Sequence, residues 1–134
     1  MQLNDDIKWV YGAILGGVFS ECASGRETHK NYKYAEDDFL LLLADIFSGM
    51  PKDNITLSYA RNMFNNLWGR MLNMQSQFFP TGEDMVYMIK RNASATELDY
   101  CINTLSDFTE HITSLLDCKG KFYGIDPLIR LFKQ

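Results

Sequence analysis

A run of apolar residues over positions 39–47 constrains this chain more than any other stretch, because every residue in it except Asp45 is apolar. A helix of this kind has no polar side to turn toward water, so it is expected in the interior. Acidic residues at positions 36–38 suit the first turn of a helix, whose end carries partial positive charge. Gly49 suits the end of the helix. The sequence therefore predicts a buried helix over about 35–50, around which the rest of the chain packs.

Helical periodicity accounts for most of the remaining chain. Apolar residues recur every three or four positions, which is the spacing of one helix face. Side chains that can cap a helix stand before three of these segments, at Asn4, Thr81 and Ser94. The predicted amphipathic helices cover about 5–22, 56–74, 82–91 and 95–118, and a short helix follows Asp126-Pro127.

The size of the chain fits one domain. It has 134 residues, of which 46% are hydrophobic, and a domain of that size buries most of its apolar surface without disulfides or a structural metal. No segment alternates convincingly as a strand does, and no internal repeat divides the chain. We therefore predict an all-α fold, with a single helical domain over residues 1–134 that forms a bundle of five to seven helices around the buried central helix.

Three glycines interrupt the first predicted helix, at positions 12, 16 and 17. Each glycine inside a helix costs about 0.5 to 1 kcal/mol relative to alanine, so their presence calls for a reason. One explanation is that another helix crosses very close to this one. The alternative is a kink or a break near Gly16-Gly17.

The cysteines and the N-terminal segment bear on where the protein resides. Cys101 and Cys118 lie 17 residues apart on one predicted helix, which separates them by about 25 Å and places them beyond disulfide reach. We expect these two cysteines and Cys22 to act as small hydrophobic residues in a reducing compartment. Residues 10–19 are too short to span a membrane, and acidic instead of basic residues precede them. The sequence predicts a cytoplasmic protein without a membrane partner.

The chemistry-bearing residues favour binding over catalysis. His29 and His111 belong to no recognisable nucleophile motif, and the chain has no glycine-rich phosphate loop and no cysteines at zinc spacing. Asp107, Glu110 and His111 share part of a helix, but they lack the Glu-x-x-His spacing of a dimetal bundle. We therefore expect a protein that is not an enzyme, with no catalytic residue, no metal and no cofactor. Acid–base sites can be assembled from distant residues, so a small enzymatic or ligand-binding bundle with a pocket among the methionines and Trp68 stays an alternative.

The clearest candidate for a binding surface is an acidic stripe on the predicted helix over 95–118. The side opposite the apolar face carries acidic and other polar residues spaced three or four apart, namely Asp99, Asn103, Asp107, Glu110, Ser114 and Asp117. Trp68 falls near the edge of an apolar stripe, where an exposed tryptophan would be an interface anchor. The alternative is a solvated helix face without a partner. The predicted partner-binding residues are Asp99, Asp107, Glu110, Asp117 and Trp68.

Charge indicates the kind of partner. A formal net charge of −4 argues against nonspecific binding to nucleic acid or to an anionic membrane, both of which need a basic surface. The leading hypothesis is a non-catalytic protein-interaction module that binds, and inhibits or escorts, a protein with a basic surface; its most concrete form is an immunity or inhibitor protein of a nuclease toxin. The alternative is a nucleic-acid-linked regulator that uses the basic and aromatic loop over 26–34, unless the tyrosines of that loop fold back onto the core.

Overall fold

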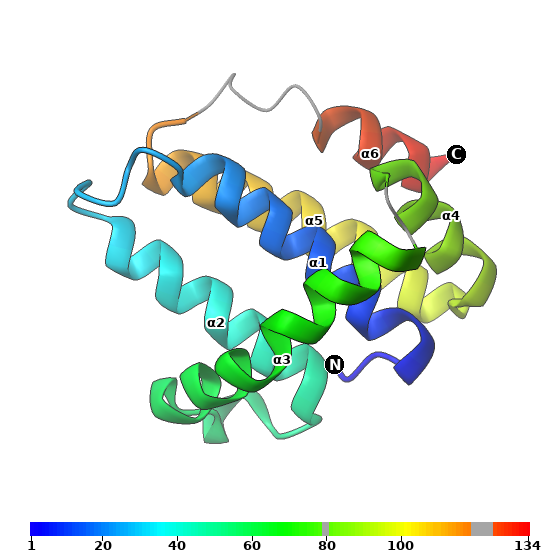
Figure 1. Ribbon diagram of the computed structural model, residues 1–134, viewed down its shortest axis with the longest axis horizontal. Coiled ribbons are helices and arrows are strands. Elements are labelled where there is room, and N and C mark those ends of the chain that lie inside the picture. Colours follow the sequence, from blue (N-terminus) through cyan, green and yellow to red (C-terminus); the bar gives the residue numbers. More distant parts are fainter. Residues whose placement is uncertain (79–80, 119–124) are drawn as a thin grey trace.

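The computed structural model describes residues 1–78, 81–118 and 125–134, which form an assembly of α-helices (Figure 1). The part of the chain described contains no strand, and the prediction of an all-α bundle of five to seven helices is confirmed. The extent of the single domain stays a prediction. The helices are α1 (Asp5–Ala23), α2 (Tyr32–Ser48), α3 (Leu57–Phe78), α4 (Gly82–Asn92), α5 (Ala95–Leu115) and α6 (Ile125–Lys133), with a short 3-10 turn η1 (Lys52–Asn54) between α2 and α3.

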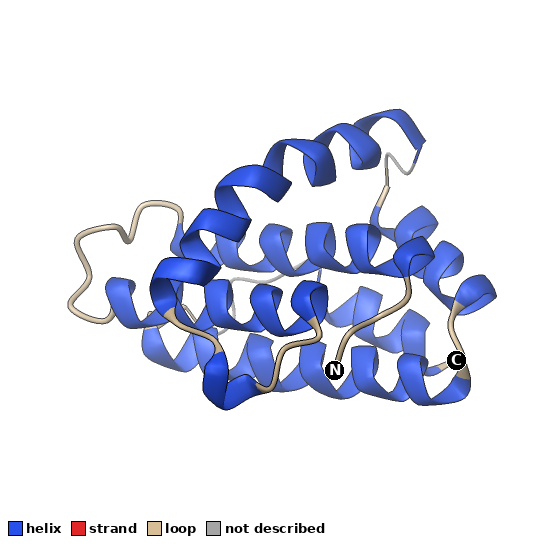
Figure 2. Cartoon of the chain, turned by 90° about the horizontal axis from the view of Figure 1, so that it is seen from below, coloured by secondary structure: helices blue, strands red, loops and turns tan. Residues whose placement is uncertain are grey.

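Two helices share the interior of the bundle. α1 contacts α2, α3, α4 and α5, and α2 contacts α1, α3 and α5. Figures 1 and 2 show α3 crossing α1 and α2 on one side of the bundle, while α5 lies on the opposite side. α6 packs against α4 and α5 and covers one end.

The helix predicted over 35–50 is buried along most of its length. Phe39, Leu40, Leu43, Ala44, Ile46 and Phe47 are buried in α2, and Gly49 ends the helix in the left-handed conformation (φ 67°) that favours glycine. The remaining edge of the apolar run, formed by Leu41, Leu42 and Asp45, is only half-buried. This edge faces α5 across a surface cleft.

Close packing explains two of the three glycines of α1. α1 is continuous from Asp5 to Ala23, so the helix does not break at Gly16-Gly17. A Cβ atom on Gly12 would lie 2.6 Å from Met71 Sδ, and a Cβ atom on Gly16 would overlap the Trp68 ring. The predicted close crossing is therefore confirmed and is made by α3. Gly17 has open space where a Cβ would stand and has no such role.

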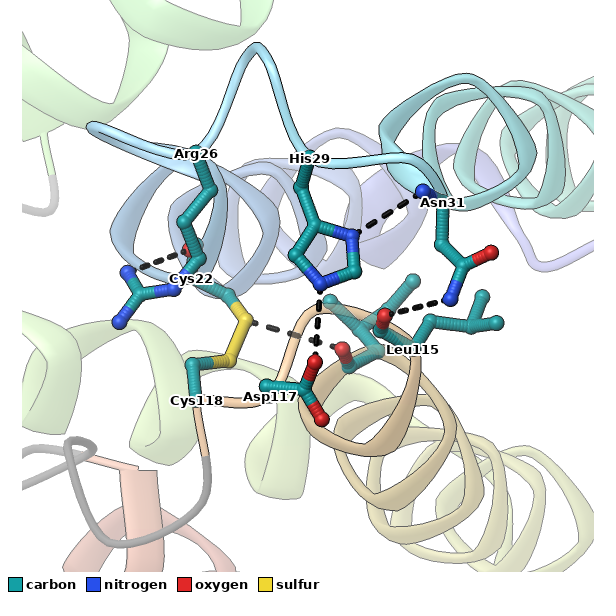
Figure 3. Close-up of polar contacts among 8 residues, drawn as sticks. Cys22, Arg26, His29, Asn31, Leu115, Asp117 and Cys118 are labelled. Carbon is teal, nitrogen blue, oxygen red and sulfur yellow. Dashed lines mark hydrogen bonds and ion pairs between the residues drawn. A yellow bond between two sulfur atoms is a disulfide. The ribbon is translucent and has the colours of Figure 1, made fainter.

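The cysteine expectation is wrong at two positions. Cys22, at the end of α1, and Cys118, just after α5, form a buried disulfide with a Cα–Cα distance of 6.2 Å (Figure 3). They lie 96 residues apart, so only the packing of α1 against α5 brings them together. Cys101 stays free, and its burial, assisted by the charge of Glu97, raises its pKa to about 12. Disulfides are typical of oxidising compartments, so the cytoplasmic location stays a prediction that this bond argues against.

Helix ends differ from the predictions at several places. α5 ends at Leu115 instead of 118, α3 extends to Phe78 instead of 74, and α2 begins at Tyr32, three residues earlier than predicted. In the described ranges, no helix combines the length and the apolar character that a membrane crossing requires. The predicted caps hold: Asn4, Thr81 and Ser94 each accept a backbone N–H at the start of their helix.

Candidate functional site

The acidic side of α5 faces solvent as predicted. Asp99, Asp107 and Glu110 are exposed, and none of these three has a cationic partner among the described residues. Asn103 and Ser114 lie exposed between and beyond them on the same side. This part of α5 is therefore a solvent-facing row of unpaired carboxylates.

Asp117 does not continue this row. It follows the end of α5 in the left-handed conformation (φ 55°), which aspartate tolerates better than most residues. Its Oδ2 atom lies 2.9 Å from His29 Nε2, which belongs to the loop between α1 and α2 (Figure 3). Asp117 is exposed but takes part in a contact within the chain, so the row of unpaired carboxylates ends at Glu110.

A cleft of about 460 Å³ separates the acidic side of α5 from α2. Its apolar lining comes from Leu41 and Leu42 of α2 and Phe108 of α5. Carboxylates stand around this lining. They are Asp38 and Asp45 on α2 and Asp107 on α5. The α2–α5 cleft therefore combines an apolar lining with an acidic border.

Two of the three bordering carboxylates have partners within the chain. Asp38 Oδ2 lies 2.6 Å from His111 Nε2. Asp45 Oδ2 lies 2.9 Å from the Met1 ammonium group and accepts a hydrogen bond from the Tyr100 hydroxyl at 3.2 Å. Burial, and then the charge of Asp45, raise the pKa of Tyr100 above its usual value, so this hydroxyl keeps its proton as a donor. Asp107 has no such partner among the described residues, and it is the carboxylate that the cleft leaves open to a ligand.

Trp68 lies away from the acidic row. It belongs to α3, on the opposite side of the bundle from α5, and its ring packs over Gly16 of α1. It is half-buried, as its place at the edge of the apolar stripe suggested. The structure therefore joins Asp99, Asp107 and Glu110 in one surface but does not bring Trp68 to it.

Several residues of the 26–34 loop make contacts within the chain. The loop spans 24–31, and its His29 and Asn31 bind the end of α5, where Asn31 Nδ2 donates to the Leu115 carbonyl at 3.1 Å. Tyr32 packs its ring 6.1 Å from that of Phe19. The tyrosine at position 32 thus folds back onto the core, which was the simpler of the two interpretations of this loop.

The basic residues of this region differ in their surroundings, because Lys33 is paired with acidic side chains and Lys30 is exposed. Lys33 Nζ lies 3.4 Å from Glu36 Oε1 and 3.5 Å from Asp37 Oδ1, while Lys30 and Tyr34 are exposed. The nucleic-acid alternative stays a prediction, and this geometry adds no support for it.

Within the described ranges, no three histidine, cysteine, aspartate or glutamate side chains converge closely enough to hold a metal ion. Asp107, Glu110 and His111 in particular do not converge in this way.

Sequence reasoning identified the acidic side of α5 but missed the α2 side of the cleft. Asp38 was assigned only to a helix start, and Leu41 and Leu42 were assigned to the core. One signal was available: Asp45 is the only charged residue in the apolar run, and it marks the edge of α2 that reaches the surface. Comparison of this chain with protein-family models, with curated proteins and with solved structures finds no match.

Proposed function

We propose that this protein is a non-catalytic interaction module that binds a basic segment of a protein partner in the α2–α5 cleft and thereby inhibits or escorts that partner. The observation that supports the proposal is the combination of an apolar lining, formed by Leu41, Leu42 and Phe108, with carboxylates on both helices. The most concrete form is an immunity or inhibitor protein that covers the basic surface of a nuclease toxin.

The physical argument has two parts. Carboxylates on a rigid helix speed the encounter with a cationic surface and orient it, an effect that weakens as salt rises. Lysine and arginine carry apolar stems below their charged ends, so a basic side chain can place its stem on the apolar lining and its charge near Asp107. Binding of this kind would block the partner's surface without any chemical step.

The test removes charge while keeping side-chain shape. The variant combines Asp99→Asn, Asp107→Asn and Glu110→Gln, and the probe is a peptide in which lysine and arginine alternate with leucine. We expect the dissociation constant measured by calorimetry to rise at least tenfold at low salt, since three unpaired carboxylates are lost. The salt dependence of binding should become shallower at the same time.

A matched control changes the net charge equally at exposed sites that neither belong to α5 nor line the cleft, through Glu21→Gln, Glu27→Gln and Glu83→Gln. This control should bind the peptide nearly as well as the unmodified protein. Equal weakening in both variants would show that only net charge matters. That result would contradict binding in the α2–α5 cleft.

A further inference from the structure

A second pocket lies on the opposite side of α2, between α1, α2 and α3, with a volume of about 390 Å³. The residues of α2 that line it are offset from the residues of the acidic cleft by about half a helix turn, so the two sites face different ways. Five aromatic side chains line this aromatic pocket. They are Phe19 of α1, Tyr32 and Phe39 of α2, and Phe64 and Trp68 of α3.

The aromatic wall is held in place by ring contacts. Phe39 is buried and forms the base, with its ring stacked on Phe19 at 4.9 Å between centroids. The edge-to-face partners of Phe39 are Phe64 at 5.8 Å and Trp68 at 6.5 Å, and these two rings stack on each other at 5.3 Å. Gly16 allows the Trp68 ring to lie directly on α1. Four of the five rings stay half-buried, so part of their surface is available to a ligand that fits among them.

Two side chains of opposite charge also line the aromatic pocket. Glu36 comes from α2 and Arg61 from α3. Glu36 Oε1 lies 3.4 Å from Lys33 Nζ, and Arg61 Nη2 lies 3.2 Å from Asp37 Oδ1, but neither Lys33 nor Asp37 lines the pocket. A carboxylate has two oxygens and a guanidinium has five N–H groups, so each keeps binding capacity beyond its ion-pair partner. The pocket therefore offers an acceptor for a cation and a donor for an anion.

Tyr32 adds a further donor next to Glu36. Burial, and then the negative charge of Glu36, raise the pKa of the Tyr32 hydroxyl above its usual value, so the hydroxyl keeps its proton. Ser20 and Asn65 complete the polar part of the lining. The polar groups are few and the rings are many, which is the composition of a small-molecule site, and the volume lies within the usual range of about 300–1,000 Å³.

We propose that this aromatic pocket binds a small aromatic zwitterion, of the class of the free aromatic amino acids. The ring of the ligand would lie among Phe19, Phe64 and Trp68, where offset or edge-to-face contacts are favourable. Its ammonium group would bind Glu36 and its carboxylate would bind Arg61. A purely cationic ligand satisfies only Glu36 and meets Arg61 as a like charge, whereas a zwitterion satisfies both. This site is separate from the acidic cleft and does not depend on the proposed function.

The experiment compares three compounds that share one ring. L-Phenylalanine carries both charges, phenethylamine lacks the carboxylate, and 3-phenylpropanoate lacks the amine. Binding to the full chain is followed by calorimetry and by protein NMR shifts. We expect L-phenylalanine to bind tightest and each missing charge to weaken binding about tenfold or more. Equal affinities for the three compounds, or no binding of L-phenylalanine, would overturn the proposal.

Two variants test whether Glu36 binds the ammonium group of the ligand and Arg61 binds its carboxylate. Glu36→Gln should weaken L-phenylalanine and phenethylamine but not 3-phenylpropanoate, and Arg61→Gln should weaken L-phenylalanine and 3-phenylpropanoate but not phenethylamine. Ser20→Leu fills the pocket from the exposed side of α1 and should abolish binding, while Ser58→Leu makes the same change at an exposed position of α3 outside the pocket. Unchanged binding in Ser20→Leu, with the fold intact by circular dichroism, would place the ligand elsewhere and contradict the assignment.

Discussion

The two ends of α1 are joined to α5 by different chemistry. At the N-terminal end, the Glu97 carboxylate accepts hydrogen bonds from Ser94 N at 3.0 Å and Asn4 N at 2.9 Å, and also from Asn4 Nδ2. At the C-terminal end, the Cys22–Cys118 disulfide joins α1 to the segment after α5. The links pair start with start and end with end, so α1 and α5 run in the same direction.

The two links respond to different conditions, namely pH and redox state, so one helix pair is held together in two independent ways. The polar link caps two helices with one side chain, and its strength depends on the ionisation of Glu97. The covalent link is insensitive to acid but depends on the redox state. Between them, Tyr11 donates a hydrogen bond to the Cys101 carbonyl at 2.9 Å and adds a buried polar contact near the middle of the pair.

Removal of the covalent link has the largest expected effect. Cys22→Ala combined with Cys118→Ala should lower the free energy of unfolding by about 3–5 kcal/mol, because the unfolded chain regains the entropy of a long loop. Urea unfolding of the oxidised protein and the variant measures this difference. A reductant should lower the stability of the unmodified protein toward that of the variant and leave the variant unchanged. Equal unfolding free energies for the two oxidised samples would show that the bond contributes nothing.

Removal of the polar link should have a smaller effect. Glu97→Ala takes away the acceptor for Ser94 N and Asn4 N and should cost about 1–2 kcal/mol, the usual loss for a helix cap. Thermal unfolding followed by circular dichroism measures it. Asp99→Ala removes a carboxylate from the next turn of α5 that has no described partner, and it serves as the control. A cost as small as that of the control would mean that water replaces Glu97 at both helix starts.

Acid should weaken the link made by Glu97 and leave the disulfide unchanged. The hydrogen bond from Ser94 N is the main cause that lowers the pKa of Glu97 from its usual value of 4.5, and the hydrogen bonds from Asn4 lower it further. A carboxyl group with a lowered folded pKa contributes stability that is present above its unfolded pKa and is lost as the pH falls through its folded pKa. The difference in unfolding free energy between the unmodified protein and Glu97→Gln should therefore shrink as the pH falls below about 4.5. The contribution of the disulfide, measured in the same series, should stay constant.

The smallest effect on stability is expected from removing the His29–Asp117 contact beside the disulfide. His29→Ala removes the contact with Asp117 Oδ2 and the acceptor for Asn31 N, at a site that the disulfide already holds in place. We expect a change in unfolding free energy of less than about 1 kcal/mol, as for other solvent-accessible pairs. The same substitution in the variant that combines Cys22→Ala with Cys118→Ala should have a larger effect if His29 and the disulfide support the same geometry. Identical effects in both backgrounds would show that the two contacts act independently.

Local sequence patterns predicted much of the fold. Asn4, Thr81 and Ser94 marked the starts of three helices because capping depends on residues within one turn. The glycines of α1 indicated a close crossing as one of two explanations, and at Gly12 and Gly16 the missing Cβ makes room for α3. The acidic side of α5 was visible because helical spacing alone decides which residues share a face.

The sequence by itself therefore determined the helices, their buried faces and the exposed carboxylates at Asp99, Asp107 and Glu110. Only the tertiary structure decided that Cys22 meets Cys118, that Asp38 and Asp45 face α5 across a cleft, and that rings from three helices surround one pocket. The physical reason is the range of the interactions. Periodicity and capping act within a few residues, whereas these contacts join distant segments and depend on how the helices pack.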